Sequence, residues 1–501
     1  MARTTDSIRA RAGLALFAAA LLALTASCAV QGSVVSSTLG VPDSFSQSGS
    51  APLASVWWLT LEDEQLNGLM DQALAGNFSI RSAWDRLNQA RALARKAGAD
   101  LWPSLDGTAG FSRTASRTPP QERVYTDEFS LGLSTSYEVD LWGRVRAARD
   151  AAQLDAMASE QDLHAAAMSL TAQVAGTWYQ LAEARGQIKL IDQQTKTSAD
   201  YLELVTLRFR RGQASATDVL QQQELLESTR ADKVRAESNA AVLENQLAVL
   251  IGRAPGTAEA PPGWQLPELP SLPDTGLPAD WLRRRPDIRA AYLRVQANDR
   301  DVAAAIADRF PRIDLSARGQ TTAVEASDLF RNWFVSLAGT VATPLLDGGQ
   351  RAAEVDRTRA VAAESLHSYE QTVLTGLQEV EDALARETHQ RRLIESLQKQ
   401  LELSASSVDR TRETYTKGGS DFLRFLSAQL SYQALERNYL AAQDNLVQYR
   451  IDLYTALGGA WDMQSPGAGN TSVGLTPARR PVTPPGPVLG DGPSGDYDHD
   501  V

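Results

Sequence analysis

Two versions of one sequence pattern follow each other along the chain, and this repetition restricts the folds open to it. Residues 80–84 (IRSAW) correspond to residues 288–292 (IRAAY), 208 positions later. Further on, residues 209–212 (FRRG) correspond to residues 415–418 (YTKG) at an offset of 206. Nearly constant offsets over most of a 501-residue chain indicate an internal duplication. We therefore expect two halves with the same order of elements.

Each half contains one very long stretch without proline. Residues 143–211 and 350–417 each predict a helix on the order of 100 Å long, at ~1.5 Å per residue. Gly212, Gly418 and Gly419 follow these stretches and are expected to break the helices at two turns.

Shorter helices are predicted after the turns, over 216–252 and 421–457, and they reach back only about half as far. The first helix of each half, 63–100 and 287–308, would stack end to end on the returning helix. Between the halves, residues 253–286 carry eight prolines and predict a linker.

Short segments between the helices alternate strictly between apolar and polar residues. Over 129–139, Phe, Leu, Leu, Thr, Tyr and Val share one face, with Ser, Gly, Ser, Ser and Glu on the other. The strands are predicted at about 104–114, 128–140, 312–321 and 333–345. The residues predicted to face lipid are Phe129, Leu131, Leu133, Tyr137, Val335 and Leu337.

These strands match the length and patterning of membrane strands, which need about 9–11 residues with aromatic residues near the interfaces. Trp102, Trp142, Phe310 and Trp333 stand at the strand ends. The alternative interpretation is a pair of half-buried soluble hairpins. A strand in lipid needs a neighbour on each side, because unpaired backbone groups are too costly there. The smallest membrane barrels have about eight strands, so four strands cannot close a barrel alone. The pattern therefore predicts a barrel shared between several chains.

The N-terminus has the features of an export signal. Arg3, Arg9 and Arg11 precede an apolar run over 13–26, which is too short to span a membrane. The run ends at Cys28, the only cysteine in the chain, in a small-residue context that resembles a lipoprotein cleavage box. The alternative is an ordinary secretory signal with an incidental thiol. We expect Cys28 to carry the acyl chains (palmitate) of a lipid anchor.

Composition argues against several classes of function. A formal charge of −12 disfavours a nucleic-acid-binding protein. Four scattered histidines and one cysteine predict no metal site. The sequence contains neither a nucleophile–base pattern nor a phosphate-binding loop, so we do not expect an enzyme. We also expect no cofactor.

Four motifs together resemble the TolC superfamily of outer-membrane factors, in particular its OprM-like and NodT-like lipoproteins of RND-type efflux pumps. They are 137–144 (YEVDLWGR), 283–288 (RRRPDI), 217–220 (TDVL), and the glycines after 210–211 and 416–417. The resemblance covers about 57–460. It implies a homotrimer in the cell outer membrane, with a 12-stranded β-barrel continuing into a long periplasmic α-helical barrel. It also implies a periplasmic adaptor (membrane fusion) protein and an inner-membrane RND-type pump as partners.

The resemblance also implies a periplasmic gate just beyond the tip turns Gly212, Gly418 and Gly419. Leu423 matches a frequent constricting leucine, whereas Ser427 stands where an aspartate is usual. The candidate gate residues are Leu423, Ser427, Asp421, Arg424 and Asp218. A leucine ring, charge pairs involving Arg424, or simple solvated helix-end charges all remain open for these positions.

The predicted fold is mainly α with membrane β, in duplicated helix-strand-strand-helix-helix halves. Its predicted parts are a signal peptide (1–27), a lipid-anchored linker (28–56), the first repeat (57–252), the proline-rich linker (253–286), the second repeat (287–460) and a disordered tail (461–501). The predicted function is a passive outer-membrane exit duct for small molecules in a tripartite efflux pump. The alternatives are a duct for type I protein secretion and a non-pore periplasmic coiled-coil lipoprotein.

Overall fold

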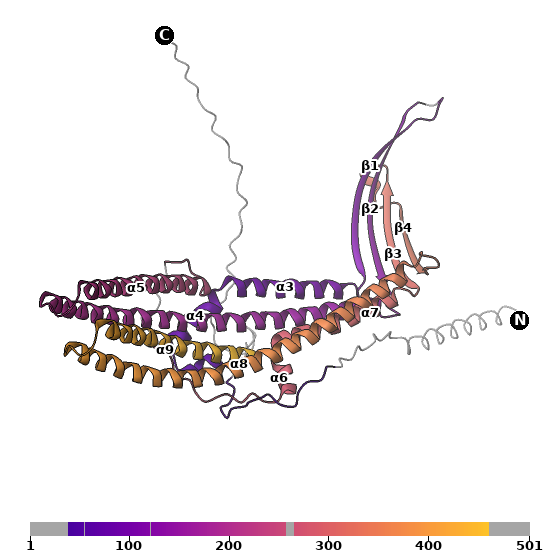
Figure 1. Ribbon diagram of the computed structural model, residues 1–501. Helices are drawn as coiled ribbons and strands as arrows, with labels where there is room; N and C mark the ends of the chain where they lie inside the picture. The colour runs from indigo at the N-terminus through magenta and orange to yellow at the C-terminus, as the bar shows by residue number, and fades with distance from the viewer. Residues whose placement is uncertain (1–38, 55, 121, 257–264, 460–501) are drawn as a thin grey trace, which may run out of the picture. The chain divides into compact units, whose positions relative to one another are not determined.

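The computed structural model describes residues 39–54, 56–120, 122–256 and 265–459 (Figure 1). Cys28, the predicted signal peptide and the predicted tail lie outside the described residues. The two halves contain the same order of helices and strands. The elements are η1 (Trp57–Leu61), α2 (Glu64–Gly76), α3 (Phe78–Ala99), β1 (Ser104–Ser116), β2 (Val124–Glu138), α4 (Arg144–Arg210), α5 (Ala216–Leu250), α6 (Pro278–Arg284), α7 (Pro286–Ala307), β3 (Arg312–Ala323), η2 (Ala326–Asp328), β4 (Trp333–Ala342), α8 (Gln350–Thr416) and α9 (Phe422–Ala456).

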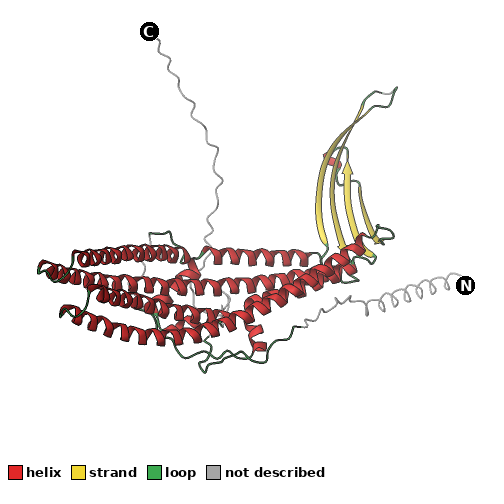
Figure 2. Cartoon of the chain, in the orientation of Figure 1, coloured by secondary structure: helices red, strands yellow, loops and turns green. Residues whose placement is uncertain are grey.

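The four strands form one antiparallel sheet in the order β1-β2-β3-β4. Figure 2 shows the strands of this sheet in yellow. Its register places Gly107, Leu133, Gly319 and Val335 in a single row across all four strands. Because side chains alternate along each strand, every odd-numbered strand residue lies on one face and every even-numbered residue on the other. The six residues predicted to face lipid therefore share the odd face.

The odd face is apolar over a limited band. On β2 the band runs from Phe129 to Tyr137, about 27 Å at ~3.4 Å per residue. The Phe129 ring meets Phe111 on β1 with centroids 4.8 Å apart. Beyond this pair the same face becomes charged, because Arg113 and Asp127 form an ion pair at 3.3 Å. The opposite face is mostly polar, with serines, threonines and charged residues.

None of the described helices is long and apolar enough to cross a lipid bilayer.

The junction between β2 and α4 explains the YEVDLWGR motif. Glu138, at the end of β2, accepts hydrogen bonds from Arg144 (2.6 Å) and Arg312 (2.7 Å). The Asp140 carboxylate accepts the backbone N–H groups of Val145 and Arg146 and so caps the new helix. The motif therefore turns a strand into a helix and ties it to the second half.

Trp142, in the same motif, stacks on Phe310 with ring centroids 4.9 Å apart. Its indole N–H donates to the Pro311 carbonyl at 2.7 Å. The aromatic–proline pair that ends α7 is thereby joined to the start of α4.

The helix predicted over 63–100 is two helices, because Asn77 interrupts it. Asn77 takes an extended conformation, and its side-chain oxygen accepts the N–H groups of Ser79 and Ile80. Its amide nitrogen donates to the carbonyl of Leu250, the last residue of α5, at 2.9 Å. One side chain thus joins the end of α5 to the start of α3.

Arg285 makes the equivalent junction in the second half. Its guanidinium donates to the carbonyl of Ala456, the last residue of α9, at 3.2 Å, and Arg285 is the N-cap position of α7. Asp287 and Glu379 each accept from the same guanidinium at 2.6 Å. The two junctions occupy positions related by the sequence offsets, 77 with 285 and 250 with 456.

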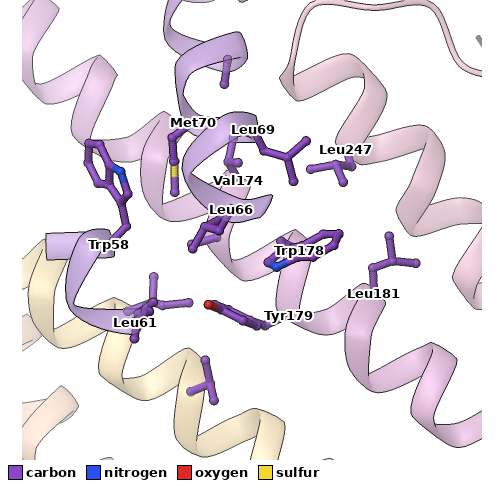
Figure 3. Close-up of a cluster of buried hydrophobic side chains, with 14 of the residues drawn as sticks. Trp58, Leu61, Leu66, Leu69, Met70, Val174, Trp178, Tyr179, Leu181 and Leu247 are labelled. Carbon is purple, nitrogen blue, oxygen red and sulfur yellow. The ribbon is translucent and has the colours of Figure 1, made fainter. Parts of the chain in front are cut away.

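The widest apolar core lies around η1 and α2, which pack on α4, α5 and α9 (Figure 3). Trp58, Leu66, Met70 and Tyr179 are buried there, and the Trp178 indole donates to Asp63 at 2.8 Å.

The proline-rich linker is held by a buried ion pair. Arg450 on α9 and Glu387 on α8 are both almost fully buried, and Arg450 also donates to the carbonyls of Pro270 and Ser271. A buried charge pair is tolerated when its remaining donors are satisfied.

Candidate functional site

The two tip turns are built in the same way. Gly212 and Gly418 take φ values of +69° and +78°, which favour glycine over residues with a side chain. A hypothetical Cβ at either position meets nothing within 4 Å, so backbone conformation and not crowding accounts for the glycines.

The carboxylates predicted at the gate act as helix caps. Asp218 and Ser215 form a capping box at the start of α5, with hydrogen bonds of 3.0 and 3.1 Å. Asp421 is the N-cap of α9 and accepts the backbone N–H of Arg424 at 3.3 Å. Among the described residues, neither carboxylate forms an ion pair with the Arg424 side chain. Asp218 and Asp421 are therefore already engaged in starting their own helices.

An aromatic cluster fills the interior of the tip. Tyr415, at the end of α8, stacks on Phe425 of α9 with centroids 6.0 Å apart. Phe422 and Tyr201 pack on these rings at 5.5 and 4.8 Å. Because the cluster draws on α4, α8 and α9, it sets the distance between these helices near the tip.

Arg208 was missed by the sequence analysis, although it joins the two halves at the tip. Its guanidinium lies 4.6 Å from the centre of the Tyr415 ring and donates to the Thr416 carbonyl at 2.7 Å. These contacts link the last turn of α4 to the last turn of α8. A basic residue in a final helical turn is a common local signal, but nothing local indicates a partner 208 residues away.

One exposed stripe on α9 carries the other predicted gate residues. Leu423 is 58% exposed, and Arg424 and Ser427 are also exposed. Leu430 continues the Leu423–Ser427 stripe at helical spacing and is 46% exposed, although the sequence analysis did not select it. The structure therefore places the predicted gate residues of α9 beside one further leucine. Both leucines, Leu423 and Leu430, face away from the rest of the chain.

Behind this stripe, α9 meets α4 through a polar seam. Gln194 donates to the Gln433 carbonyl at 3.1 Å and accepts from Arg437 at 2.7 Å. Both Gln429 and Gln433 donate to the hydroxyl of Ser198 at 3.3 Å. This α4–α9 part of the interface between the two halves is thus held by directional hydrogen bonds.

Two acidic residues lie further along the same seam. Asp444 on α9 is buried, and this burial, with the nearby Glu183 charge, raises the pKa of its carboxyl to about 6 despite a hydrogen bond from Gln448. Burial also raises the pKa of Glu183 on α4, although Gln187 donates to that carboxylate at 2.7 Å.

Among the described residues, no cluster of acidic, histidine or cysteine side chains could hold a metal ion. The site offers exposed leucines, helix caps and an arginine–tyrosine contact. Such an arrangement can narrow or widen a passage, and it provides no evident bond chemistry.

Comparison with protein families gives a match over most of the chain. The family model described as "outer membrane efflux protein" matches residues 69–253 and 277–459. The interruption between the two matched segments falls in the proline-rich linker.

Individual relatives cover nearly the same length. The pyoverdine export outer membrane protein OpmQ of Pseudomonas aeruginosa is 33% identical over 432 residues, covering 82% of this chain and 88% of the relative. The outer membrane protein OprJ of the same organism is 32% identical, covering 89% of this chain and 95% of the relative.

Solved structures show the same fold. The outer-membrane channel OprN is 29% identical and superposes with a TM-score of 0.78, covering 85% of this chain and 99% of that structure.

Asp444 provides a test of the polar seam. Its folded-state pKa of about 6 lies above the usual value, so the folded protein binds more protons than the unfolded chain between about pH 4 and 6. Stability therefore falls as the pH rises through this window, by about 2–3 kcal/mol in total. Asp444→Asn should remove the loss, so thermal unfolding of the variant should be less sensitive to pH and its midpoint higher at pH 7.5.

Glu402→Gln, at an exposed position of α8, is the matched control and should leave the pH profile unchanged. Identical profiles for wild-type protein and Asp444→Asn between pH 4 and 7 would contradict the assignment.

Proposed function

Because the chain belongs to the outer membrane efflux protein family, we propose that it is the passive exit duct of a tripartite efflux pump, gated at its helical tip. The single observation that carries this proposal is a two-faced sheet joined to helices of 67 residues. The sheet suits a bilayer on one face and water on the other. The helices, each about 100 Å long, are suited to extend the passage beyond the membrane.

The two bare edges of the sheet support a shared barrel. All residues of the edge strands β1 and β4 are exposed, and neither strand has a second neighbour among the described residues. Unpaired backbone groups are too costly in lipid, so these edges require partners. The four strands alternate in direction, so β4 of one copy would be antiparallel to β1 of the next. We infer a homotrimer with a closed ring of twelve strands.

The two faces of the sheet fix the orientation of each strand in this barrel. The apolar odd face, including Leu337 at 81% exposure, would contact lipid. Its band of about 27 Å is close to the ~25 Å apolar band of outer-membrane barrels. The polar even face would line the water-filled interior. Internal duplication of the chain accounts for the two equivalent hairpins.

The tip would form the gate. In a symmetric trimer each tip turn occurs three times around one axis, so exposed side chains on α9 are brought together. Leu423, Ser427 and Leu430 would narrow the passage, and the Arg208–Tyr415 contact would hold α4 and α8 together in the closed arrangement. The same symmetry would bring the three copies of Arg424 close together. Within the described part of one chain, Arg424 forms no ion pair that would offset their charges.

The partners follow from this placement. A periplasmic adaptor and an inner-membrane RND-type pump would deliver small molecules to the tip, as the family likeness implies. A duct for protein secretion would share this architecture, but the named relatives favour efflux: OpmQ is described as an export protein for pyoverdine. The protein would reside in the cell outer membrane, anchored by lipid at Cys28 and extending into the periplasm.

The gate can be tested by single-channel recording in planar bilayers. Leu423→Ser should raise conductance by making the constriction wider and easier to hydrate, and Arg208→Ala should raise it by releasing α4 from α8. Leu403→Ser, at an exposed leucine of α8 away from the tip, is the control and should behave as wild type. Unchanged conductance in both tip variants would place the constriction elsewhere.

The facing of the strands can be tested by arginine substitution. Leu131→Arg or Leu337→Arg should destabilise the assembled protein by about 2–4 kcal/mol, because a charge near the bilayer midplane is costly. Ser134→Arg, on the even face, should assemble normally. Trimer yield on non-denaturing gels measures the effect, and equal loss in all three variants would show that the facing is wrong.

The lipid anchor can be tested by mass spectrometry of the purified protein. A triacylated Cys28 at the mature N-terminus is expected. Cys28→Ser, exported on a replacement signal, should retain some trimer because barrel strands insert without the acyl chains. An unmodified N-terminus beyond residue 28 would refute the anchor.

A further inference from the structure

A pocket of about 310 Å³ lies in the polar seam between α4, α8 and α9, farther from the tip turns than the exposed stripe of α9. The side chains that matter for its chemistry come from all three helices: Gln194 and Tyr201 on α4, Asp409 on α8, and Gln429, Tyr432 and Glu436 on α9. Its size is in the range of small-molecule sites.

The charge of the lining is negative. Glu436 and Asp409 contribute carboxylates, and no lysine or arginine is among the described residues that line the pocket. Arg412 pairs with Asp409 at 3.0 Å and offsets its charge. Glu436 forms no ion pair within the described chain; it accepts hydrogen bonds from Gln194 at 2.9 Å and from the Tyr432 hydroxyl. One carboxylate of the pocket therefore has no direct ion-pair partner among the described residues, although Arg437 donates to the neighbouring Gln194.

An unused acceptor in the lining points to a donor ligand. Gln429 is only 2% exposed, and its amide nitrogen donates a hydrogen bond to the Ser198 hydroxyl at 3.3 Å. Its side-chain oxygen has no hydrogen-bond partner among the described residues, and Gln429 lines the pocket. A buried acceptor without a partner is unfavourable, so a ligand that donates a hydrogen bond to it is favoured.

Two tyrosines add aromatic surface to the lining. Burial, together with the hydrogen bond to Glu436 and the charge of Asp409, raises the pKa of Tyr432 to about 12. Tyr432 therefore stays a neutral phenol. Tyr201 lies against the apolar Phe425 with ring centroids 4.8 Å apart. Aromatic rings beside a carboxylate are the usual surroundings of a bound organic cation.

We propose that this pocket binds a small organic cation carrying a primary ammonium group. The ammonium donates to the Glu436 carboxylate, the organic part of the molecule lies against the tyrosine rings, and the free oxygen of Gln429 is a further acceptor in the same lining. A primary ammonium has three donors and no acceptor, which matches a lining that offers several acceptors and contains no lysine or arginine. The proposal stands independently of the channel function, because it concerns binding to the wall of the molecule.

Binding would connect the two halves of the chain. The lining belongs to α4 in the first half and to α8 and α9 in the second. A ligand that contacts all three helices favours the arrangement in which they are close together. The thermal unfolding midpoint should accordingly rise with ligand concentration.

Isothermal titration calorimetry of the full chain in lipid nanodiscs at pH 7.5 tests the proposal with three matched probes. Benzylamine should bind saturably, with one site per chain. Benzyl alcohol, which has the same shape without the charge, should not bind. Benzyltrimethylammonium keeps the charge but has no N–H donor, and it should bind more weakly than benzylamine.

Glu436→Gln should weaken benzylamine binding about tenfold or more, because it removes the charge and keeps the shape. Glu227→Gln, at an exposed acid of α5, is the matched control and should bind as wild type. Thr197→Phe, at the exposed mouth of the pocket, should block binding without altering Glu436, so it remains informative if Glu436→Gln does not assemble.

Three outcomes would overturn the proposal. Equal binding of benzyl alcohol and benzylamine would mean that the pocket is only an apolar cavity. Equal effects of Glu436→Gln and Glu227→Gln would show that the cation binds elsewhere. Absence of saturable benzylamine binding, with Glu436→Gln lowering trimer stability, would mean that a side chain of a neighbouring copy occupies the pocket.

Discussion

A helix of 67 residues needs apolar or hydrogen-bonding neighbours along its whole length, and none of the described helices that pack along α4 or α8 is that long. The returning helices α5 and α9 have 35 residues each, so they cover about half of α4 and α8. The remainder is covered by α3 and α7, which begin where the returning helices end. Everything else depends on the two junctions, because they align four short helices into two continuous partners for the long ones.

The two junctions solve the same problem with different chemistry. At a helix C-terminus the last carbonyls lack partners, and at an N-terminus the first N–H groups do. Asn77 satisfies both needs with one amide, whereas Arg285 supplies a buried charge that requires Asp287 and Glu379 to balance it. The junction within the second half therefore contains ionic contacts that the junction of the first half lacks.

The two halves share apolar clusters, and between α4 and α9 they also meet through a polar seam, which affects what the molecule can do. Apolar interfaces fill space and resist a change of register, whereas the glutamines between α4 and α9 make discrete hydrogen bonds. Such bonds can be exchanged for bonds to water at modest net cost. The Arg208–Tyr415 contact and the aromatic cluster close the seam at the tip, next to the site proposed to gate the duct.

Much of the fold could be predicted because its signals are local. Helix length follows from the absence of proline, the glycines after Arg211 and Lys417 mark the turns, and alternation assigned Leu131 and Leu337 to one face of a sheet. Alternation within single strands was sufficient for this, because antiparallel pairing keeps faces in register. Asn77 was overlooked because the helical pattern continues on both sides of it, although asparagine is a preferred N-cap residue.

The repeat, the lengths of the helices and the two faces of each strand could be read from the sequence alone, because each depends on neighbouring residues. The contacts of Asn77 with Leu250 and of Arg208 with Tyr415, and the pocket that Glu436, Gln429 and Asp409 line, became visible only in the folded chain. The residues of each junction lie far apart along the chain, and the pocket draws on three different helices. The periodicity of apolar residues indicates which face of a helix or strand is buried. Which residue contacts that face depends on how the helices pack in the folded chain.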